Sequence, residues 1–442
     1  MGRGQTRTRS ATQASAGVAK PSVQQSAPAL PRRAAGELDG PASQSNLRQA
    51  HEGSSSPIND NPDNNMRVDS PSMQRALPTS RTRFITTKNW NHTALLQKGR
   101  HFHTPLRVSI MDKFERVEKA LAKFERDGVP LIITDCHQHS AWPNGNGIFT
   151  IDWLIRKYGN INITARNIHN CLDEQAKLAD FVAQSRSMGV YASDNESKRL
   201  YAKDAPCPAE WKQWLQESGT VPLNLRPCST NDLLQYLYEY EAVENLMCYY
   251  GIGDTFTPCH KDLCGSTGHN LMCHTEDGGS SFWFMTASGS APVVAKHFQS
   301  RFGQELDWES YVVSVEDFAE APFDVYVVEQ KLGDLVLVPP RSCHQVVNRG
   351  GLTMKMSWSR MTMKGLEIAL HHELPIYRRV CRKEHYRVKT VVYRSLLHYT
   401  GVLASSDSPH TSQSSSTTHR AHPPHSHSPG DNASPSLHSF DP

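Results

Sequence analysis

Three side chains of this sequence are suited to bind one metal ion, although they lie far apart along the chain. His260 and Asp262 occur as His-Lys-Asp in residues 257–262, which indicate an extended segment. Side chains alternate between the two faces of an extended segment, so this imidazole and this carboxylate point to the same side. His344 follows GDLVLVPP (333–340), a pattern typical of a turn, a buried strand and a second turn.

Two imidazoles and one carboxylate on one side of a metal leave three coordination positions open, as in non-haem Fe(II) oxygenases. A 2-oxo acid can occupy two of these positions and dioxygen the third. A lone His-x-Asp is a weak signal, and the alternative for these residues is a set of buried, hydrogen-bonded polar groups. A distal histidine after a Gly-Asp-strand-Pro element favours metal binding. We therefore predict an Fe(II) site at His260, Asp262 and His344.

The elements that must position these residues lie between two low-complexity tails. Residues 1–80 and 405–442 are rich in Ser, Pro and other small or polar residues, and such compositions predict disorder. The ordered region then runs from about 82 to 403. We divide it into an α/β lead-in (82–200), a catalytic core (200–363) and C-terminal helices (364–403).

The lead-in predicts mixed α/β structure. A helix over 111–128 is indicated by helical spacing and by the glycine that ends it. Its predicted packing positions are Phe114, Val117, Leu121 and Phe124. The other predicted elements are helices at 151–158 and 175–188 and strands at 129–133 and 160–166.

The core changes to short β-like segments separated by turn residues, a pattern that favours an all-β barrel or sandwich. These segments are 245–250, 270–274, 282–287, 311–315, 324–329, 334–338, 345–347 and 352–359. Residues 364–403 return to helix. Their predicted packing positions are Leu366, Ile368, Leu370, Ile376, Val380, Val391, Leu396 and Leu397.

Several stretches of this sequence resemble JmjC domains. They are YYGIGDTFTPCHKDLCGSTGHNLM (249–272), GSSFWFMTA (279–287), GDLVLVPPRSCHQVVNRGGLTMKMSW (333–358), DGVPLIITD (127–135) and LYAKDAPCPAEW (200–211). The resemblance implies an α+β fold in which a double-stranded β-helix (cupin or jelly roll) is flanked by N-terminal and C-terminal helices. It also implies Fe(II) held by His260, Asp262 and His344, 2-oxoglutarate as co-substrate with Thr257 among its contacts, and O2 as oxidant.

The sequence departs from the family where many members have a lysine that pairs with the far carboxylate of 2-oxoglutarate. Ser280 and Ser281 stand at that place, and a buried dicarboxylate with an unpaired end is costly. Lys355, in an Arg-x-Ser-like element, is the predicted replacement, and Lys296 is a weaker candidate. The alternative for Lys355 is a lysine that reaches solvent beside the barrel.

Three further residues are candidates to contact the co-substrate or substrate: Asn348, Tyr250 and Trp283. Each also has a purely structural explanation. Asn348 precedes Arg-Gly-Gly and suits a turn, and aromatic residues in strands such as Tyr250 and Trp283 are commonly part of the core. Thr257 has a structural explanation as well, since a hydroxyl at a strand end can hydrogen-bond to the backbone.

The ten cysteines are scattered without a CxxC pair, which suits small core residues in a reducing compartment. Zinc at Cys259, Cys264, Cys273 and Cys343 is an alternative that lacks the usual close pair. A net charge of +3 does not favour nucleic-acid binding by the whole chain, and no sequence-specific nucleic-acid motif is present. No apolar run approaches the ~20 residues that cross a bilayer, so no membrane association is expected.

The resemblance leads to three hypotheses of different kinds. The first is demethylation of methyl-lysine in histone tails, with chromatin as partner and the nucleus as location. The second is hydroxylation of a protein side chain by the same fold. The third is a catalytically weak chromatin scaffold, given the missing strand lysine. The cytoplasm is the alternative location, ahead of the mitochondrion.

Overall fold

A computed structural model describes residues 85–145 and 147–406, so the predicted tails lie outside the described residues except for 405–406. The helices are α1 (His92–Leu96), α2 (Phe114–Asp127), α3 (Ile151–Tyr158), α4 (Leu178–Ser187), α5 (Ala209–Glu217), α6 (Ala291–His297), α7 (Val315–Ala319), α8 (Met363–Ile368), α9 (Leu374–Val380) and α10 (Val388–Ser406). The strands are β1 (Phe102–His103), β2 (Leu106–Ser109), β3 (Leu131–Thr134), β4 (Asn162–Asn167), β5 (Asp173–Lys177), β6 (Leu200–Pro206), β7 (Leu246–Gly251), β8 (Phe256–His260), β9 (Thr267–Thr275), β10 (Ser280–Met285), β11 (Val325–Gln330), β12 (Leu335–Val338), β13 (His344–Arg349) and β14 (Thr353–Arg360).

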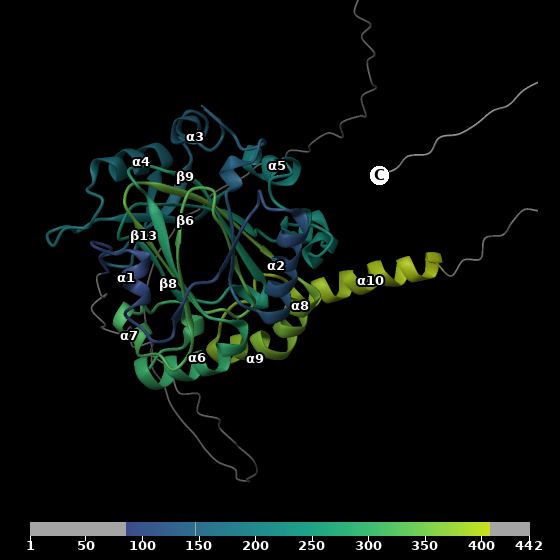
Figure 1. The fold of residues 1–442 in the computed structure, drawn as a ribbon. Helices are drawn as coiled ribbons and strands as arrows, with labels where there is room; N and C mark the ends of the chain where they lie inside the picture. Colours follow the sequence, from purple (N-terminus) through teal and green to yellow (C-terminus); the bar gives the residue numbers. More distant parts are fainter. Residues whose placement is uncertain (1–84, 146, 407–442) are drawn as a thin grey trace, which may run out of the picture. The chain divides into compact units, whose positions relative to one another are not determined.

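Two sheets form the core (Figure 1). The smaller has the order β1-β11-β10-β13-β8, and the larger has the order β2-β3-β12-β9-β14-β7-β6-β4-β5. A buried cluster joins Ile132 and Val336 of the larger sheet to Trp283, Val328 and Val346 of the smaller one, so the sheets pack face to face. This α+β arrangement confirms the double-stranded β-helix that the resemblance implied.

Helix α2 covers the outer face of the larger sheet, as its apolar spacing predicts. Val117, Leu121 and Phe124 are buried in the cluster that also contains the outer residues of β3, β9 and β12. Gly128 ends the helix in the left-handed conformation (φ 63°), which glycine adopts without strain. Phe114, the first residue of the helix, is 76% exposed, so its predicted packing role is wrong.

Other predicted helices and strands differ from the structure, because pairing between distant segments decides which of them become strands. The first residues of the predicted helix 175–188 form β5, because they pair with β4. The predicted strand 311–315 pairs with no strand and instead leads into α7. The strands β1, β2 and β6 and the helices α1, α5, α6 and α7 were not predicted, whereas β8 lies in the segment that was predicted to be extended.

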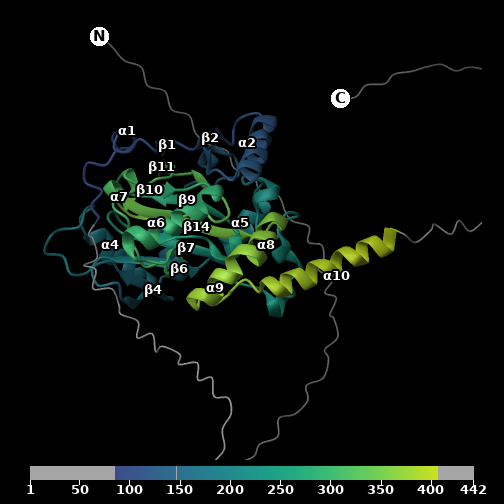
Figure 2. The same cartoon turned by 90° about the horizontal axis from the view of Figure 1, so that it is seen from below.

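The C-terminal helices differ in how they pack. Leu366 and Val391 are buried as predicted, but Leu370, Leu396 and Leu397 are exposed. Figures 1 and 2 both show α10 extending away from α8 and α9, so only its first turns have a surface to pack against. Among the described residues no helix is both long enough and apolar enough to span a membrane. Six of the ten cysteines are buried.

Candidate metal centre

The pairing of β8 with β13 brings the three sequence-predicted ligands together. The two strands are antiparallel and place His344 directly opposite His260. The ring centroids of these histidines are 4.0 Å apart, and Nε2 of His344 lies 3.9 Å from Oδ1 of Asp262. One ligand atom from each of the three residues falls within 4.8 Å of the others, and no second such group of His, Cys, Asp or Glu is found within 85–145 and 147–406.

Both histidines are held with the same nitrogen free for a metal. Nδ1 of His260 lies 2.9 Å from the carbonyl oxygen of Pro258, and Nδ1 of His344 lies 3.1 Å from that of Ser342. A carbonyl oxygen only accepts hydrogen bonds, so each Nδ1 carries the proton and each Nε2 presents a lone pair. Burial, and then the charge of His344, lowers the pKa of His260 well below its ordinary range, which keeps the imidazole neutral as metal ligation requires.

Asp262 contributes a buried carboxylate with one unpaired oxygen. Its Oδ2 is buried without a hydrogen-bond partner among the described residues, and burial raises the pKa of the carboxyl group. Gly268 leaves room for this oxygen, because a Cβ at that position would come within 2.0 Å of Oδ2. A divalent metal would satisfy the orphaned oxygen and restore the charged form, so these residues fit Fe(II).

A cavity of about 590 Å³ is lined by the three triad residues and by Lys355. Lys355 is 1% exposed, and its Nζ donates to Oδ1 of Asn348 at 2.6 Å and to Oγ of Ser281 at 2.8 Å. It forms no ion pair with a described carboxylate, and burial lowers its pKa to about 7. A buried ammonium that faces a cavity without an acidic partner is suited to bind an anion.

Lys355 approaches the place where many family members carry their lysine. It belongs to β14 of the larger sheet, whereas Ser281 belongs to β10 of the smaller sheet across the barrel. The ammonium therefore reaches from the opposite wall to the position of the absent side chain. Lys296, the weaker candidate, lies on α6, is exposed and does not line the cavity, so that prediction is wrong.

Thr257 and Trp283 line the cavity as predicted, and a further residue was missed. Oγ1 of Thr257 donates to the hydroxyl of Tyr201 at 3.4 Å, and the ring of Trp283 stacks on His344 at 5.9 Å. Tyr201 is buried, which raises its pKa to about 12 and keeps the phenol protonated as a donor. It comes from β6, which pairing with β7 brings beside the barrel, and no local pattern around Tyr201 indicates this role. Gly251 makes space here, because its Cβ would meet Nδ2 of Asn348 at 2.5 Å.

Tyr250 was predicted to line the cavity, and the structure places it elsewhere. It is 1% exposed in the core beneath the outer helices, together with the alternate residue Cys248. The neighbouring residue Tyr249 lines the cavity, and its hydroxyl donates to Oδ1 of Asp204 at 2.6 Å. Successive strand residues point to opposite faces of the sheet, so an error of one residue exchanges the residue that faces the cavity for the one that faces the core.

Lys261, between two of the triad residues, attaches them to the C-terminal helices. It points away from His260, is 4% exposed, and its Nζ lies 2.7 Å from Oε2 of Glu373 and 3.3 Å from Oδ1 of Asp307. Nε of Arg341 also contacts Glu373, at 3.1 Å. The zinc alternative gains no support from this region, since Cys259 and Cys343 lie in one packed cluster while Cys264 and Cys273 lie in two others.

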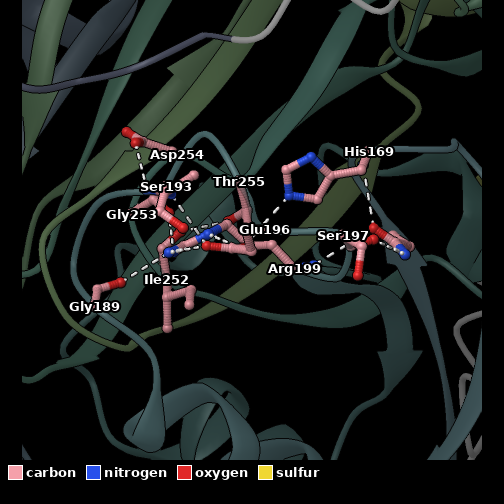
Figure 3. Close-up of polar contacts among 12 residues, drawn as sticks. His169, Gly189, Ser193, Glu196, Ser197, Arg199, Ile252, Gly253, Asp254 and Thr255 are labelled. Atoms are coloured by element: carbon pink, nitrogen blue, oxygen red, sulfur yellow. Dashed lines mark hydrogen bonds and ion pairs between the residues drawn. The ribbon is translucent and has the colours of Figure 1, made fainter.

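A buried arginine braces the turn that leads into β8 (Figure 3). Arg199 has no exposed surface, and its guanidinium donates to the carbonyl oxygens of Gly253 and Gly189 at 2.7 and 2.9 Å. Its Nε donates to Oε1 of Glu196 at 2.8 Å. The absence of a side chain at Gly253 lets the neighbouring segment pass close to the turn, because a Cβ at this position would lie 2.0 Å from the carbonyl oxygen of Val190. The turn is therefore held on one side by a charged pair.

Asp254 holds the same turn from its other side. Its backbone is left-handed (φ 64°), and its carboxylate accepts hydrogen bonds from the backbone N–H groups of Thr87 and Ala192 at 2.6 and 2.9 Å. Three segments distant in sequence thus fix where β8 begins and hence where His260 lies.

Comparisons with known proteins match this description. A family model for the JmjC domain, hydroxylase, matches residues 247–359, which extend from β7 to β14. The chain is 32% identical over 273 residues to C-module-binding factor A of Dictyostelium discoideum. That alignment covers 61% of this chain and 26% of the relative, so the chain spans about a quarter of the relative's length.

Proposed function

Because the chain contains a JmjC domain, a domain of the Fe(II)/2-oxoglutarate oxygenase type, we propose that it is a 2-oxoglutarate-dependent protein oxygenase whose preferred reaction is demethylation of histone methyl-lysine. The location that goes with this proposal is the nucleus, with chromatin as the partner. The same iron chemistry would hydroxylate an ordinary side-chain carbon, so a protein hydroxylase is the second candidate.

The observation that carries the proposal is the buried, acid-free ammonium of Lys355 in the cavity of the triad. A dicarboxylate that reached the metal with one end would place its other carboxylate against Nζ of Lys355, with Asn348 and Ser281 beside it. The hydroxyls of Thr257 and Tyr201 would add donors. This arrangement supports 2-oxoglutarate, and it argues against the loss of co-substrate binding that the missing strand lysine suggested.

Each residue then has a part that its contacts support. His260 and His344 would present Nε2 to Fe(II), because their Nδ1 protons are engaged by backbone carbonyls. Asp262 would supply the third ligand and Lys355 would orient the co-substrate by charge. When bound, Fe(II) supplies the coupling of 2-oxoglutarate decarboxylation to oxygen activation and C–H oxidation.

The outer part of the cavity supports a polar polypeptide as substrate. Its lining includes the exposed carboxylates of Asp204 and Glu244 and the partly exposed carboxylate of Glu309. Lys203 pairs with Asp204, and Arg382 pairs with Glu309, so the rim has charges of both signs. Such a rim suits charged peptide side chains better than an apolar small molecule.

Succinate release from the full-length protein with Fe(II) and 2-oxoglutarate tests the proposal. We expect release by the wild type and by a control variant at an exposed histidine, His371→Ala, and none above background from His260→Ala. Equal release from all three proteins would refute catalysis at this site and leave the scaffold hypothesis.

Mass spectrometry of methylated histone peptides then separates the two reactions. Demethylation removes ~14 Da per methyl group and hydroxylation adds ~16 Da, and both follow from one facial triad. A product of +16 Da on an unmethylated residue, with methyl-lysine unchanged, would contradict the demethylase and support the hydroxylase.

A further inference from the structure

Helix α10 has two apolar stripes, and one of them packs against the rest of the described chain. Val391 and Ser395 are buried, and the ring centroid of Tyr399 lies 5.7 Å from that of Tyr236. Residues four apart lie on the same side of a helix, so Val391, Ser395 and Tyr399 form the first stripe. This stripe attaches α10 to α8 and to the segment before β7.

The second stripe of α10 is open to solvent. Its residues are spaced three, four and three apart, like the contact positions of paired helices: Tyr393, Leu396, Thr400 and Leu403. A helix turns by roughly 100° per residue, so this stripe lies roughly 120° around the helix axis from the first. Tyr393, Leu396 and Leu403 are 56%, 60% and 65% exposed, and Leu397 beside them is 47% exposed. Figures 1 and 2 show the helix extending away from the two sheets, which leaves this stripe uncovered by them.

The second stripe is also free of charge along most of its length. Residues 395–405 contain no Asp, Glu, Lys or Arg. The hydroxyl of Thr400 donates to the carbonyl oxygen of Leu396 at 2.9 Å, so this residue has a partner for its donor when it is buried. An uncharged surface gives a charged partner nothing to pair with, whereas the contact spacing of the stripe is complementary to itself.

We propose that the second stripe pairs α10 with the α10 helix of a second copy of this chain. The exposed parts of its three leucines and its tyrosine amount to roughly 450 Å² per copy, so two copies would cover roughly 900 Å², somewhat below the ~1,200 Å² at which specific interfaces begin. Further apolar surface lies next to the helix, because Met363 is 61% exposed and lines a cavity together with Tyr399. An interface of this size suits a reversible dimer.

The pairing is antiparallel. The rest of the described chain joins α10 at its N-terminal end, so a parallel pair would bring both copies together at that end. A parallel pair would also place Lys389, one turn before Tyr393 on the same side, beside its counterpart. An antiparallel pair avoids both conflicts and sets Tyr393 of one copy beside Leu403 of the other. Each contact then occurs twice about a two-fold axis, as a closed dimer requires.

Sedimentation velocity of the full-length protein between about 1 and about 100 µM tests the dimer, because small interfaces saturate in this range. We expect the wild type to associate, and Leu396→Lys combined with Leu403→Lys to associate about 10-fold or more weakly, since two buried leucines are lost from each copy. Both leucines are exposed in the single chain, so thermal unfolding should show that this variant folds. Leu223→Lys is the matched control, because Leu223 is 60% exposed on another part of the surface.

A wild type that stays monomeric at about 100 µM would overturn the proposal and leave the stripe to a different protein or to a membrane surface. A dimer that the two lysines do not weaken would overturn it as well. The direction of pairing has its own test: Tyr393→Glu with Leu403→Lys should associate more strongly than Tyr393→Lys with Leu403→Lys, because only the first sets opposite charges side by side. Equal association of these two variants would overturn the antiparallel arrangement.

Discussion

Replacement of Lys355 by methionine should separate a co-substrate receptor from a structural lysine. Methionine fills a similar volume, so the change removes the charge and leaves the packing nearly intact. Burial lowers the pKa of Lys355 from 10.5 to about 7, which corresponds to roughly 5 kcal/mol against the charged form. Two hydrogen bonds to Nζ are lost, but Ser281 still donates to Asn348 at 2.8 Å. The free energy of unfolding without ligand should therefore stay equal or rise.

In contrast to stability, the affinity for 2-oxoglutarate should decrease in Lys355→Met. Removal of one partner from a buried charge pair costs ~3–5 kcal/mol, so affinity should fall about 100-fold or more. Calorimetry with 2-oxoglutarate and thermal unfolding without it measure the two effects separately. A variant that unfolds much earlier, or that binds 2-oxoglutarate as the wild type does, would refute the assignment of Lys355.

The lowered pKa of Lys355 predicts how pH affects 2-oxoglutarate binding and the stability of the fold. The folded protein without ligand loses the Lys355 proton near pH 7, whereas the unfolded chain keeps it until about pH 10.4. Between these values the unfolded state binds more protons, so this group makes stability rise with pH. A bound carboxylate raises the pKa again, so binding at about pH 8.5 should take up close to one proton. Calorimetry in two buffers of different ionisation enthalpy measures that uptake, and its absence would contradict the pKa assigned to Lys355.

Three further variants test the geometry of the site. Gly268→Ala places a Cβ within 2.0 Å of the triad carboxylate and should weaken Fe(II) binding about 10-fold or more in a chelator competition; wild-type affinity would contradict the close fit. The exchange Ser281→Lys with Lys355→Ser should recover much of the 2-oxoglutarate affinity that Lys355→Ser alone loses, since the two side chains meet at 2.8 Å; no recovery would refute the shared position. Arg199→Leu removes the arginine partner of the partly buried Glu196 and the donor to the carbonyl oxygens of Gly189 and Gly253, and it should lower the free energy of unfolding by ~3–5 kcal/mol in denaturant titration; a loss under about 1 kcal/mol would contradict the bracing role.

The sequence alone determined the parts of this protein that depend on local periodicity. The two-residue spacing of His260 and Asp262, the turn signals around 333–340 and the helical spacing in α2 each predict what the structure has. Lys355 was singled out in another way, through the family resemblance, because a dicarboxylate site without its usual lysine requires another cation. These signals lie within one element, where side-chain direction follows from backbone repeat.

Only the tertiary structure decided which residues meet across elements. Tyr201 enters the site through sheet pairing, and Tyr249 replaces Tyr250 because strand register sets the face that each residue occupies. Leu396 and Leu397 have the spacing of a packed helix, yet both are exposed, and it is the neighbouring His398 and Tyr399 that contact Tyr236.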